Sequence, residues 1–147
     1  MSRVQVVRFV VGERHYALDV MVVKEVVVPK QAQPVVGQPP FVEGLVELRG
    51  DYVPLIDLRR RFGAPAPGRD ARLLVLSCLQ REIALLVDSV GEVAWIDTDR
   101  LRPAPVNTSS AGAQAVEAIA DIDGTMVMLL AGEALLSEAE WAQVLPL

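Results

Sequence analysis

Cysteine, histidine and aromatic residues are scarce in this chain of 147 residues. The single cysteine, Cys78, excludes an internal disulfide, and the single histidine, His15, leaves few ligands for a metal site. With 52% hydrophobic but only 5% aromatic residues, the core must be built mainly from aliphatic side chains. This composition excludes a disordered tail, a collagen-like chain and a coiled coil.

Excess positive charge and long apolar runs are also lacking. The formal net charge is −5 and the sequence pI is near 4.9, which argues against a surface for nucleic acid or anionic lipid. Charged residues such as Asp19, Lys24 and Asp57 interrupt the apolar runs before they reach the roughly 18–20 residues of a membrane span. The N-terminus has no apolar signal core, so a cytoplasmic protein is expected.

Valine-rich segments separated by turn residues dominate the sequence and predict four β-hairpins. Gly50-Asp51 and Asp123-Gly124 are the predicted turns of two of them, because glycine tolerates a positive φ. Pro54 cannot donate to a strand ladder, so its strand is expected to lie at a sheet edge or to carry a bulge. The paired strands are expected at 4–11 with 16–20, 45–49 with 52–56, 73–79 with 83–87, and 117–122 with 125–130.

Helix and loop signals are few. Only residues 133–144 have helical periodicity, with Leu135, Leu136, Ala139 and Val144 able to share one face. Segment 102–114 is expected to form an exposed loop. The Pro/Gly-rich segment 63–68 lies near the centre of the chain and is the natural boundary between two lobes.

The chain also repeats itself. Segment 16–26 aligns with segment 83–93, and six of the eleven positions are identical. A second alignment, with a longer linker in the second half, places Gly50 on Gly124 and Leu55 on Leu129. Each half then holds about five short strands, the size of a small closed barrel. An all-β fold of two packed barrels is predicted, with approximate lobes 1–68 and 69–147 and with exchange of terminal strands between the lobes left open.

Candidate catalytic groups are few and each has a structural interpretation. Cys78 lies in an apolar segment, where a free cysteine is usually a buried hydrophobe, and His15 is interpreted as a solvated turn residue. Asp57 and Asp88 each end an apolar strand, and two carboxylates at a suitable separation could perform acid–base chemistry. Capping of a following turn, or pairing with an arginine of the run 59–61, is the favoured interpretation. A small hydrolase or redox enzyme is therefore the least favoured function.

Partner binding is the favoured alternative to catalysis. Small barrels bind peptides or helices through apolar contacts and an anchoring arginine. Arg49 directly precedes the predicted turn at 50–51, where a rigid backbone can aim its guanidinium group at a carboxylate. The alternative interpretation of Arg49 is an exposed turn residue without a partner.

Five segments follow the pattern of a known family in order: 9–19 (FVVGERHYALD), 23–26 (VKEV), 41–63, 86–93 (LVDSVGEV) and 101–105 (LRPAP). Together they strongly resemble the CheW-like chemotaxis coupling proteins. The most specific part is 44–63, in which Leu-Arg-Gly is followed by Pro-Leu-Ile-Asp-Leu-Arg. The resemblance covers nearly the whole chain. It implies a single CheW-like domain over 1–147 with two packed five-stranded SH3-like barrels, short helical segments and a C-terminal helix.

The resemblance also implies a function. Members of this family are non-enzymatic adaptors without a cofactor or metal. They link the cytoplasmic tip of methyl-accepting chemoreceptors to the regulatory domain of a histidine kinase, in membrane-associated arrays and without entering the membrane; other CheW-like domains are further expected partners. The receptor's helical hairpin lies in the groove between the barrels, and the kinase contacts a separate face of the first barrel, for which no residues are assigned. Receptor-contact positions of the family fall here on Val23, Glu25, Gly44, Arg49, Val87 and Val93.

Several positions depart from the family pattern. Glu47 replaces the asparagine that often precedes Leu-Arg-Gly, and Asp51-Tyr52 replaces a pair that is commonly small or aliphatic. Ala118 replaces the usual glycine of the last hairpin; Ala84 and Ala131 are further departures. These changes motivate an alternative hypothesis, a divergent member that binds receptors or other array components without engaging the kinase and thereby modulates the array.

Overall fold

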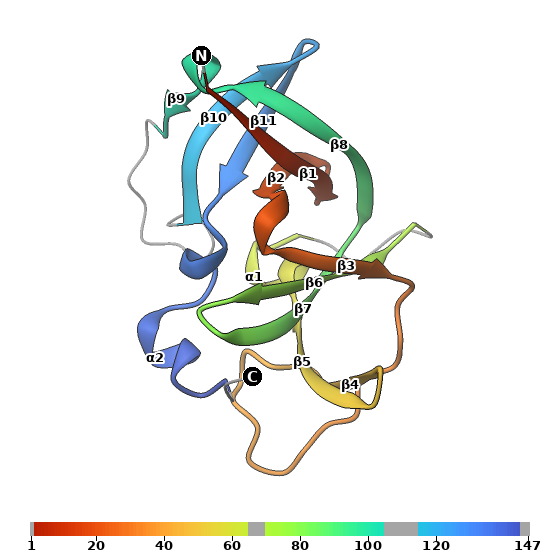
Figure 1. Ribbon diagram of the computed structural model, residues 1–147. Coiled ribbons are helices and arrows are strands. Elements are labelled where there is room, and N and C mark those ends of the chain that lie inside the picture. The colour runs from red at the N-terminus through yellow and green to blue at the C-terminus, as the bar shows by residue number, and fades with distance from the viewer. Residues whose placement is uncertain (1, 65–69, 105–114, 145–147) are drawn as a thin grey trace.

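The computed structural model describes residues 2–64, 70–104 and 115–144, which form two β-sheets and several short helices (Figure 1). We call barrel 1 the unit of the five-stranded sheet, of order β3-β6-β7-β5-β4, and barrel 2 that of the six-stranded sheet, of order β8-β1-β2-β11-β10-β9. The strands of barrel 1 are β3 (Val23–Val27), β4 (Gly44–Leu48), β5 (Asp51–Asp57), β6 (Arg72–Cys78) and β7 (Arg81–Val87). Those of barrel 2 are β1 (Arg3–Val11), β2 (Arg14–Asp19), β8 (Ser89–Asp97), β9 (Arg102–Pro103), β10 (Val116–Ile122) and β11 (Thr125–Leu130). The short helices are η1 (Val20–Val22), α1 (Leu58–Arg61), η2 (Thr98–Arg100), η4 (Gly132–Ala134) and α2 (Glu138–Trp141).

The four predicted hairpins are confirmed, with every strand end within two residues of its expected place. One turn differs from the prediction. Leu48 pairs with Asp51, so the turn residues are Arg49 and Gly50, with φ of 52° and 84°. Positive φ at both central residues is the type I′ geometry that matches the twist of a two-residue hairpin.

The prediction that Pro54 marks an edge strand or a bulge is wrong. Strand β5 lies between β7 and β4, and its register with β4 is unbroken through the pair of Pro54 with Leu45. The parallel pairing of β5 with β7 begins only at Leu55. Proline is tolerated because this part of β5 has β4 as its only partner strand.

The sequence repeat is also a repeat of structure. In the first of the two alignments β1, β2 and β3 correspond to β6, β7 and β8, and in the second β4 and β5 correspond to β10 and β11. The registers correspond as well. Leu55 faces Ala84 in barrel 1 as Leu129 faces Ala17 in barrel 2, and Gly44 faces Leu55 as Ala118 faces Leu129. The two barrels are therefore related by pseudo-symmetry, position by position.

The barrels differ from the predicted lobes 1–68 and 69–147. Barrel 1 is formed from residues 23–87, whereas barrel 2 combines residues 3–19 with residues 89–130. Hairpin β1–β2 pairs with β8 and β11 of the other repeat, and hairpin β6–β7 pairs with β3 and β5. Each repeat thus places its first hairpin in one barrel and its other strands in the other. The predicted boundary at 63–68, of which 65–68 lie outside the described residues, falls in the sequence between β5 and β6, which are both strands of barrel 1.

Three hydrophobic clusters hold this arrangement together. One fills barrel 1 around Val46 and Leu73, and another fills barrel 2 around Val6 and Val127. The largest lies between the barrels and takes outward-facing residues from β1, β2, β6 and β7. Phe9 of this cluster is 1% exposed, and its ring stacks on that of Tyr16 with 5.7 Å between centroids. Because this junction is a continuous apolar core, the two barrels form one rigid body.

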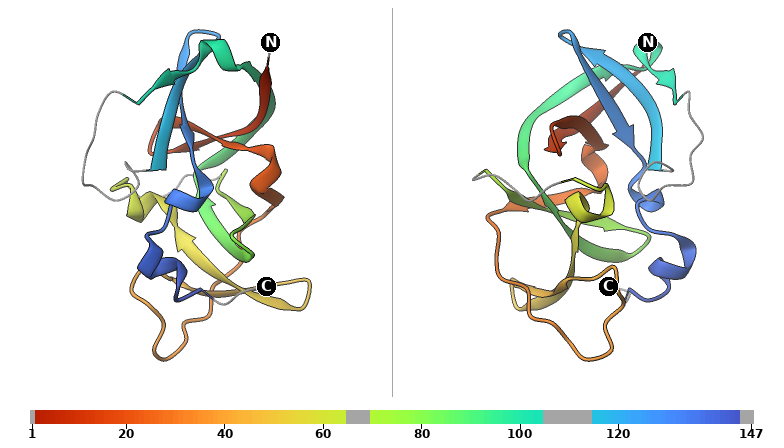
Figure 2. Two further views of the ribbon diagram at one scale, coloured as in Figure 1. Left: turned by 60° about the vertical axis from the view of Figure 1, so that its left-hand side comes forward. Right: turned by 180° about the vertical axis from the view of Figure 1, so that it is seen from behind.

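The predicted helix over 133–144 is wrong in extent. The segment instead contains the single turn η4, a bend, and the four-residue helix α2. Ser137 and Glu140 form a capping box that begins a new helix after the bend. From β11 the segment descends along barrel 1 (Figure 2), where Trp141 and Val144 join the inter-barrel cluster.

Glu140 connects this C-terminal segment to barrel 1 and gives a pH-dependent prediction. Both carboxylate oxygens accept hydrogen bonds from Arg61, at 3.0 and 2.5 Å. Burial opposes ionisation of this carboxyl, but the hydrogen bonds from Arg61 and Ser137 outweigh it, so the pKa of Glu140 is lowered. A carboxyl with a lowered pKa stabilises the fold above its unfolded value of about 4.3, and this contribution is lost as the pH falls.

We therefore expect Glu140→Gln to reduce the free energy of unfolding by about 0.5–1 kcal/mol at pH 7. At pH 3 the difference in stability between wild type and variant should be smaller, because the contribution of the ionised carboxyl is lost as the pH falls through its lowered pKa. Urea unfolding of both proteins at the two pH values measures the difference. An equal difference in the free energy of unfolding at both pH values would show that ionisation of Glu140 contributes nothing to stability.

Candidate functional site

The tip of hairpin β4–β5, strand β3 and the start of β7 bring four charged side chains together. Lys24 Nζ donates to Glu82 Oε2 at 2.7 Å, and Arg49 Nη2 donates to Glu82 Oε1 at 3.3 Å. The other terminal nitrogen of Arg49, Nη1, pairs with Glu25 Oε1. We call Lys24, Glu25, Arg49 and Glu82 the charged cluster. It includes two of the predicted receptor-contact residues, Glu25 and Arg49.

The members of the charged cluster differ in exposure. The side chain of Glu82 is 7% exposed, whereas that of Arg49 is 44% exposed. A buried carboxylate is costly unless charged donors satisfy it, and here Lys24 and Arg49 each bind one oxygen. The cluster therefore contains a buried carboxylate, that of Glu82. Its arginine reaches solvent, although both terminal nitrogens are bound to carboxylates.

The backbone of Arg49 has the left-handed conformation of a type I′ turn residue. Its φ of 52° lies in the left-handed region, which costs an ordinary residue about 1–2 kcal/mol. Asparagine, aspartate and glycine are the residues that suit this position of a type I′ turn. The equivalent residue of hairpin β10–β11 is Asp123, with the same φ of 52°. Leu79, in the turn of hairpin β6–β7, also has φ of 52°, so this conformation does not by itself distinguish Arg49 from the other turn residues.

The predicted valines occupy different environments. Val23 is partly buried against the inter-barrel cluster, and Val93 on the edge strand β8 is 50% exposed. Both can contribute to a surface at the junction of the barrels. Val87 is 0% exposed within the inter-barrel cluster, so its side chain supplies no contact area for a partner. The expectation that Val87 lines an apolar groove does not agree with the structure, because the Val87 side chain lies in the core.

Gly44 has a structural role that the sequence did not indicate. The residue is buried at the start of β4, with φ of 151°. A β-carbon there would lie 2.7 Å from the carbonyl oxygen of Gln33, which is closer than real side chains allow. Gln33 and Leu45 exchange backbone hydrogen bonds beside this point, each of 2.9 Å. Gly44 thus allows the segment before β4 to cover the edge of barrel 1.

A groove of about 830 Å³ on barrel 1 was not predicted. Its apolar walls come from the loop before β4, where Val35 and Val36 are exposed, and from Tyr52 on β5, which is 62% exposed. Lys24 and Glu82 also line it, so the groove adjoins the charged cluster. The sequence signal that was missed is the Val35-Val36 pair between a proline and a glycine.

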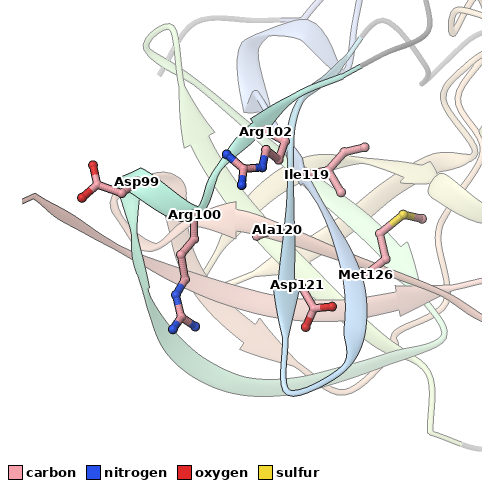
Figure 3. Close-up of a pocket in the computed structure, with 7 residues that line it drawn as sticks. All are labelled: Asp99, Arg100, Arg102, Ile119, Ala120, Asp121 and Met126. Atoms are coloured by element: carbon pink, nitrogen blue, oxygen red, sulfur yellow. The ribbon is translucent and has the colours of Figure 1, made fainter.

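The corresponding surface of barrel 2 is a cavity of about 510 Å³ between η2–β9 and hairpin β10–β11 (Figure 3). Ile119 and Met126 there are the pseudo-symmetric equivalents of Leu45 and Tyr52. Figure 3 shows Arg100 and Arg102 on one side and Asp121 on the other, with Asp99 also at the rim. The lining thus contains two arginines and two aspartates, so its formal charges sum to zero.

The groups considered for catalysis have structural roles. Asp57 caps α1 and pairs with Arg59, which confirms the interpretation of this residue. Asp88 Oδ2 accepts from the backbone N–H of Gly12 at 2.6 Å, so it binds a turn distant in the sequence and not the following turn as expected. Burial raises the pKa of the Cys78 thiol to about 11, which disfavours the reactive thiolate. His15 is half-buried within strand β2 and not in a turn as predicted, since it pairs with Val10 and Val127. Within the described ranges no three histidine, cysteine, aspartate or glutamate residues are grouped as metal ligands.

The chain matches the family model described as the CheW-like domain over residues 5–140. It is 30% identical over 138 residues to the chemotaxis protein CheW of Klebsiella aerogenes, covering 92% of this chain and 83% of that protein. It is also 30% identical to the probable chemotaxis protein CheW of Rhizobium etli, covering 92% of this chain and 89% of that protein. Among solved structures, the scaffolding protein TtCheW of Thermoanaerobacter tengcongensis superposes with a TM-score of 0.79 at 33% identity, covering 88% of this chain and 90% of that chain.

These similarities agree with the predicted fold and with the family resemblance seen in the sequence. The all-β architecture with two SH3-like barrels is confirmed by the two sheets and by the likeness to the solved scaffold. The relatives are named as chemotaxis and scaffolding proteins, not as enzymes. The chain belongs to the CheW-like family of chemotaxis scaffold proteins.

Proposed function

We propose that this protein is a non-enzymatic adaptor that binds the cytoplasmic tip of methyl-accepting chemoreceptors and couples it to the regulatory domain of a histidine kinase. The observation that carries the proposal is Arg49, which projects from a strained hairpin tip and remains 44% exposed within the charged cluster. A guanidinium group fixed on a rigid strand pair suits recognition of a carboxylate on a partner helix. Glu25 beside it offers an acceptor to a basic group of the same partner.

Exposed apolar residues on the edge strands β3 and β8 support a helical partner. Val93 and Trp95 on β8 are 50% and 56% exposed, and Val26 on β3 is 43% exposed. Val26 and Val93 are equivalent under the pseudo-symmetry, and both strands pack beside the inter-barrel junction. An apolar surface with charged residues at its rim is the usual anatomy of a protein–protein interface. We therefore assign the receptor hairpin to this junction, with Val23, Glu25, Arg49 and Val93 in contact and Gly44 in support.

The kinase needs a second surface, so that one rigid body can hold both partners. The apolar groove of barrel 1, with Val36 and Tyr52 exposed, is the surface we propose for it. Contiguous exposed apolar surface of this kind marks interaction sites in otherwise soluble folds. Signal would pass as a difference in contacts between states of the kinase, because an adaptor can bias an equilibrium only by such differences.

The proposed site of action is the cytoplasmic chemoreceptor array. In the part of the chain that the structure describes, no helix is long and apolar enough to cross a membrane. Association with the membrane would then arise through the receptors.

The experiment that tests this function is a pair of calorimetric titrations of the purified protein. One titrant is a helical-hairpin fragment of a chemoreceptor tip from the same organism, and the other is the regulatory domain of its chemotaxis kinase. We expect both to bind, with dissociation constants of about 1–100 µM, the range of transient signalling contacts. Absence of receptor binding would contradict the proposal.

A second candidate function is favoured by the departures Glu47, Asp51 and Tyr52, of which Tyr52 lines the groove assigned to the kinase. On this alternative the protein binds receptors or other CheW-like domains without engaging the kinase and modulates the array. Binding of the receptor fragment alone would select this alternative. Binding of both partners, with restored kinase control in reconstituted arrays, would exclude it.

A further inference from the structure

We infer that Glu82 is a positioning residue for partner recognition, which holds the Arg49 guanidinium group in the direction that the receptor surface requires. The inference rests on the proposed function, because the partner concerned is the receptor tip. Glu82 is not a contact residue itself, since its side chain is only 7% exposed. It acts through Arg49, and Lys24 acts in turn through Glu82.

The contacts of Glu82 fix the orientation of its carboxylate, because each oxygen is bound by a different cation. Oε1 accepts from Arg49 Nη2 at 3.3 Å, and Oε2 accepts from Lys24 Nζ at 2.7 Å. The carboxylate is therefore bound at both oxygens and cannot rotate without losing a charged donor. Because Arg49 Nη1 pairs with Glu25 on strand β3, the guanidinium plane is held between two strands of barrel 1. Its remaining exposed surface can then meet a partner carboxylate in one orientation.

The second barrel provides an internal control for this interpretation. The equivalents of Lys24, Glu25, Arg49 and Glu82 in barrel 2 are Gly91, Glu92, Asp123 and His15. Hairpin β10–β11 adopts the same turn, with φ of 52° and 86°, but its position equivalent to Arg49 is an aspartate. The fold thus builds the same strands and the same tip without this set of ion pairs. The charged cluster is not a requirement of the architecture, so its presence in barrel 1 alone points to recognition.

Stability is a poor explanation for a buried glutamate in this place. Glu82 is the second residue of β7, and the next residues, Ile83, Ala84 and Leu85, are all 0% exposed. Removing a carboxylate from water offsets much of its attraction to nearby cations, and an apolar residue of similar size is often at least as stabilising. A bound carboxylate fixes the direction of the arginine side chain, and an apolar side chain cannot do so.

The test uses the full chain with Glu82→Gln, which preserves size and removes the charge. Before any partner is added, relaxation of the Arg49 Nε–H bond reports on the order of the guanidinium group. We expect its order parameter to fall from the wild-type value to below about 0.6, the range of flexible groups. Titration with the receptor-tip fragment should then show binding about fivefold to tenfold weaker than wild type.

A double-mutant cycle separates positioning from a general structural role. Glu82→Gln should have no further effect on binding when Arg49 is already alanine, because nothing remains to be positioned. Glu140→Gln is the matched control, since it removes a carboxylate from another arginine pair of the same protein; it should lower stability and leave receptor binding unchanged.

The outcomes distinguish this inference from the proposed function. An unchanged order parameter of Arg49 in Glu82→Gln would overturn the positioning role, whatever the partner does. An equal loss of binding in the wild-type and Arg49→Ala backgrounds would overturn it as well, because Glu82 would then act by another route. Lack of receptor binding by wild type, together with the expected loss of order, would overturn the proposed function and leave Glu82 as the residue that orders Arg49.

Discussion

A fragment of residues 69–147 is expected to show no cooperative unfolding transition, although it contains one complete sequence repeat. The reason is the exchange of hairpins between the repeats. The fragment retains β8 and β11, but β1 and β2, which lie between them in the six-stranded sheet, are missing. The inter-barrel cluster also loses Phe9, Tyr16 and Leu18. The whole free energy of unfolding, about 5–15 kcal/mol for a domain, should therefore be lost.

Thermal melting followed by circular dichroism, with the intact chain as reference, measures this effect. The complementary fragment 1–68 should also be unfolded alone, because it lacks β6 and β7 from the middle of the five-stranded sheet. Mixing the two fragments should restore a cooperative transition, since each supplies the hairpin that the other needs. A fragment 69–147 that melts cooperatively by itself would show that the lobes fold as independent units.

Arg49→Ala is expected to weaken binding of the receptor-tip fragment by about 1–3 kcal/mol, which is roughly 5-fold to 150-fold. The side chain is 44% exposed, and its guanidinium group is the part of the charged cluster best placed to meet a carboxylate. The variant should remain folded, because Arg49 lies at a hairpin tip outside the three hydrophobic clusters. Calorimetric titration of wild type and variant measures the change, and thermal melting verifies the fold.

The pseudo-symmetry supplies a matched control for this variant. Asp123→Ala makes the same kind of change at the equivalent turn of barrel 2, again at φ of 52°. It should have no effect on receptor binding and should cost less stability than Arg49→Ala, because only Arg49→Ala removes a charged donor from the buried Glu82. Arg49→Lys adds a second comparison, because lysine retains the charge but cannot engage Glu25 and Glu82 with two separate nitrogens. Wild-type affinity of Arg49→Ala at normal stability would remove Arg49 from the receptor surface.

The hairpins, the all-β class and the family were all accessible in the sequence. Alternation of valines with turn residues identifies strands because side-chain direction and turn φ are local properties of the backbone. The C-terminal helix was predicted too long because the capping box of Ser137 and Glu140, which begins a new short helix, was overlooked within an apolar periodic segment. Pro54 was misjudged because it depends on where the pairing of β5 with β7 begins, and this is set by a strand distant in the sequence.

Of the candidate site, Arg49 and Glu25 were indicated by the sequence, but Lys24 and Glu82 were not. The two new residues join the cluster because β3 and β7 reach the tip of hairpin β4–β5 in three dimensions. Val87 shows the opposite error, since its burial depends on the inter-barrel core and not on its own strand. Side-chain contacts between distant strands carry no local signal in one sequence.

The sequence by itself determined the strands, their turns and the presence of a repeat, because each of these depends on residues close together in the chain. Only the tertiary structure decided which repeat contributes which strands to each barrel. Adjacent segments can pair with each other or with equivalent segments of the other repeat, and the sequences of the strands suit both arrangements. The large apolar surface buried between β1, β2, β6 and β7 accompanies the exchanged arrangement. The same exchange makes 23–87 one barrel, and within that barrel the turn that carries Arg49 meets strand β7, which carries Glu82.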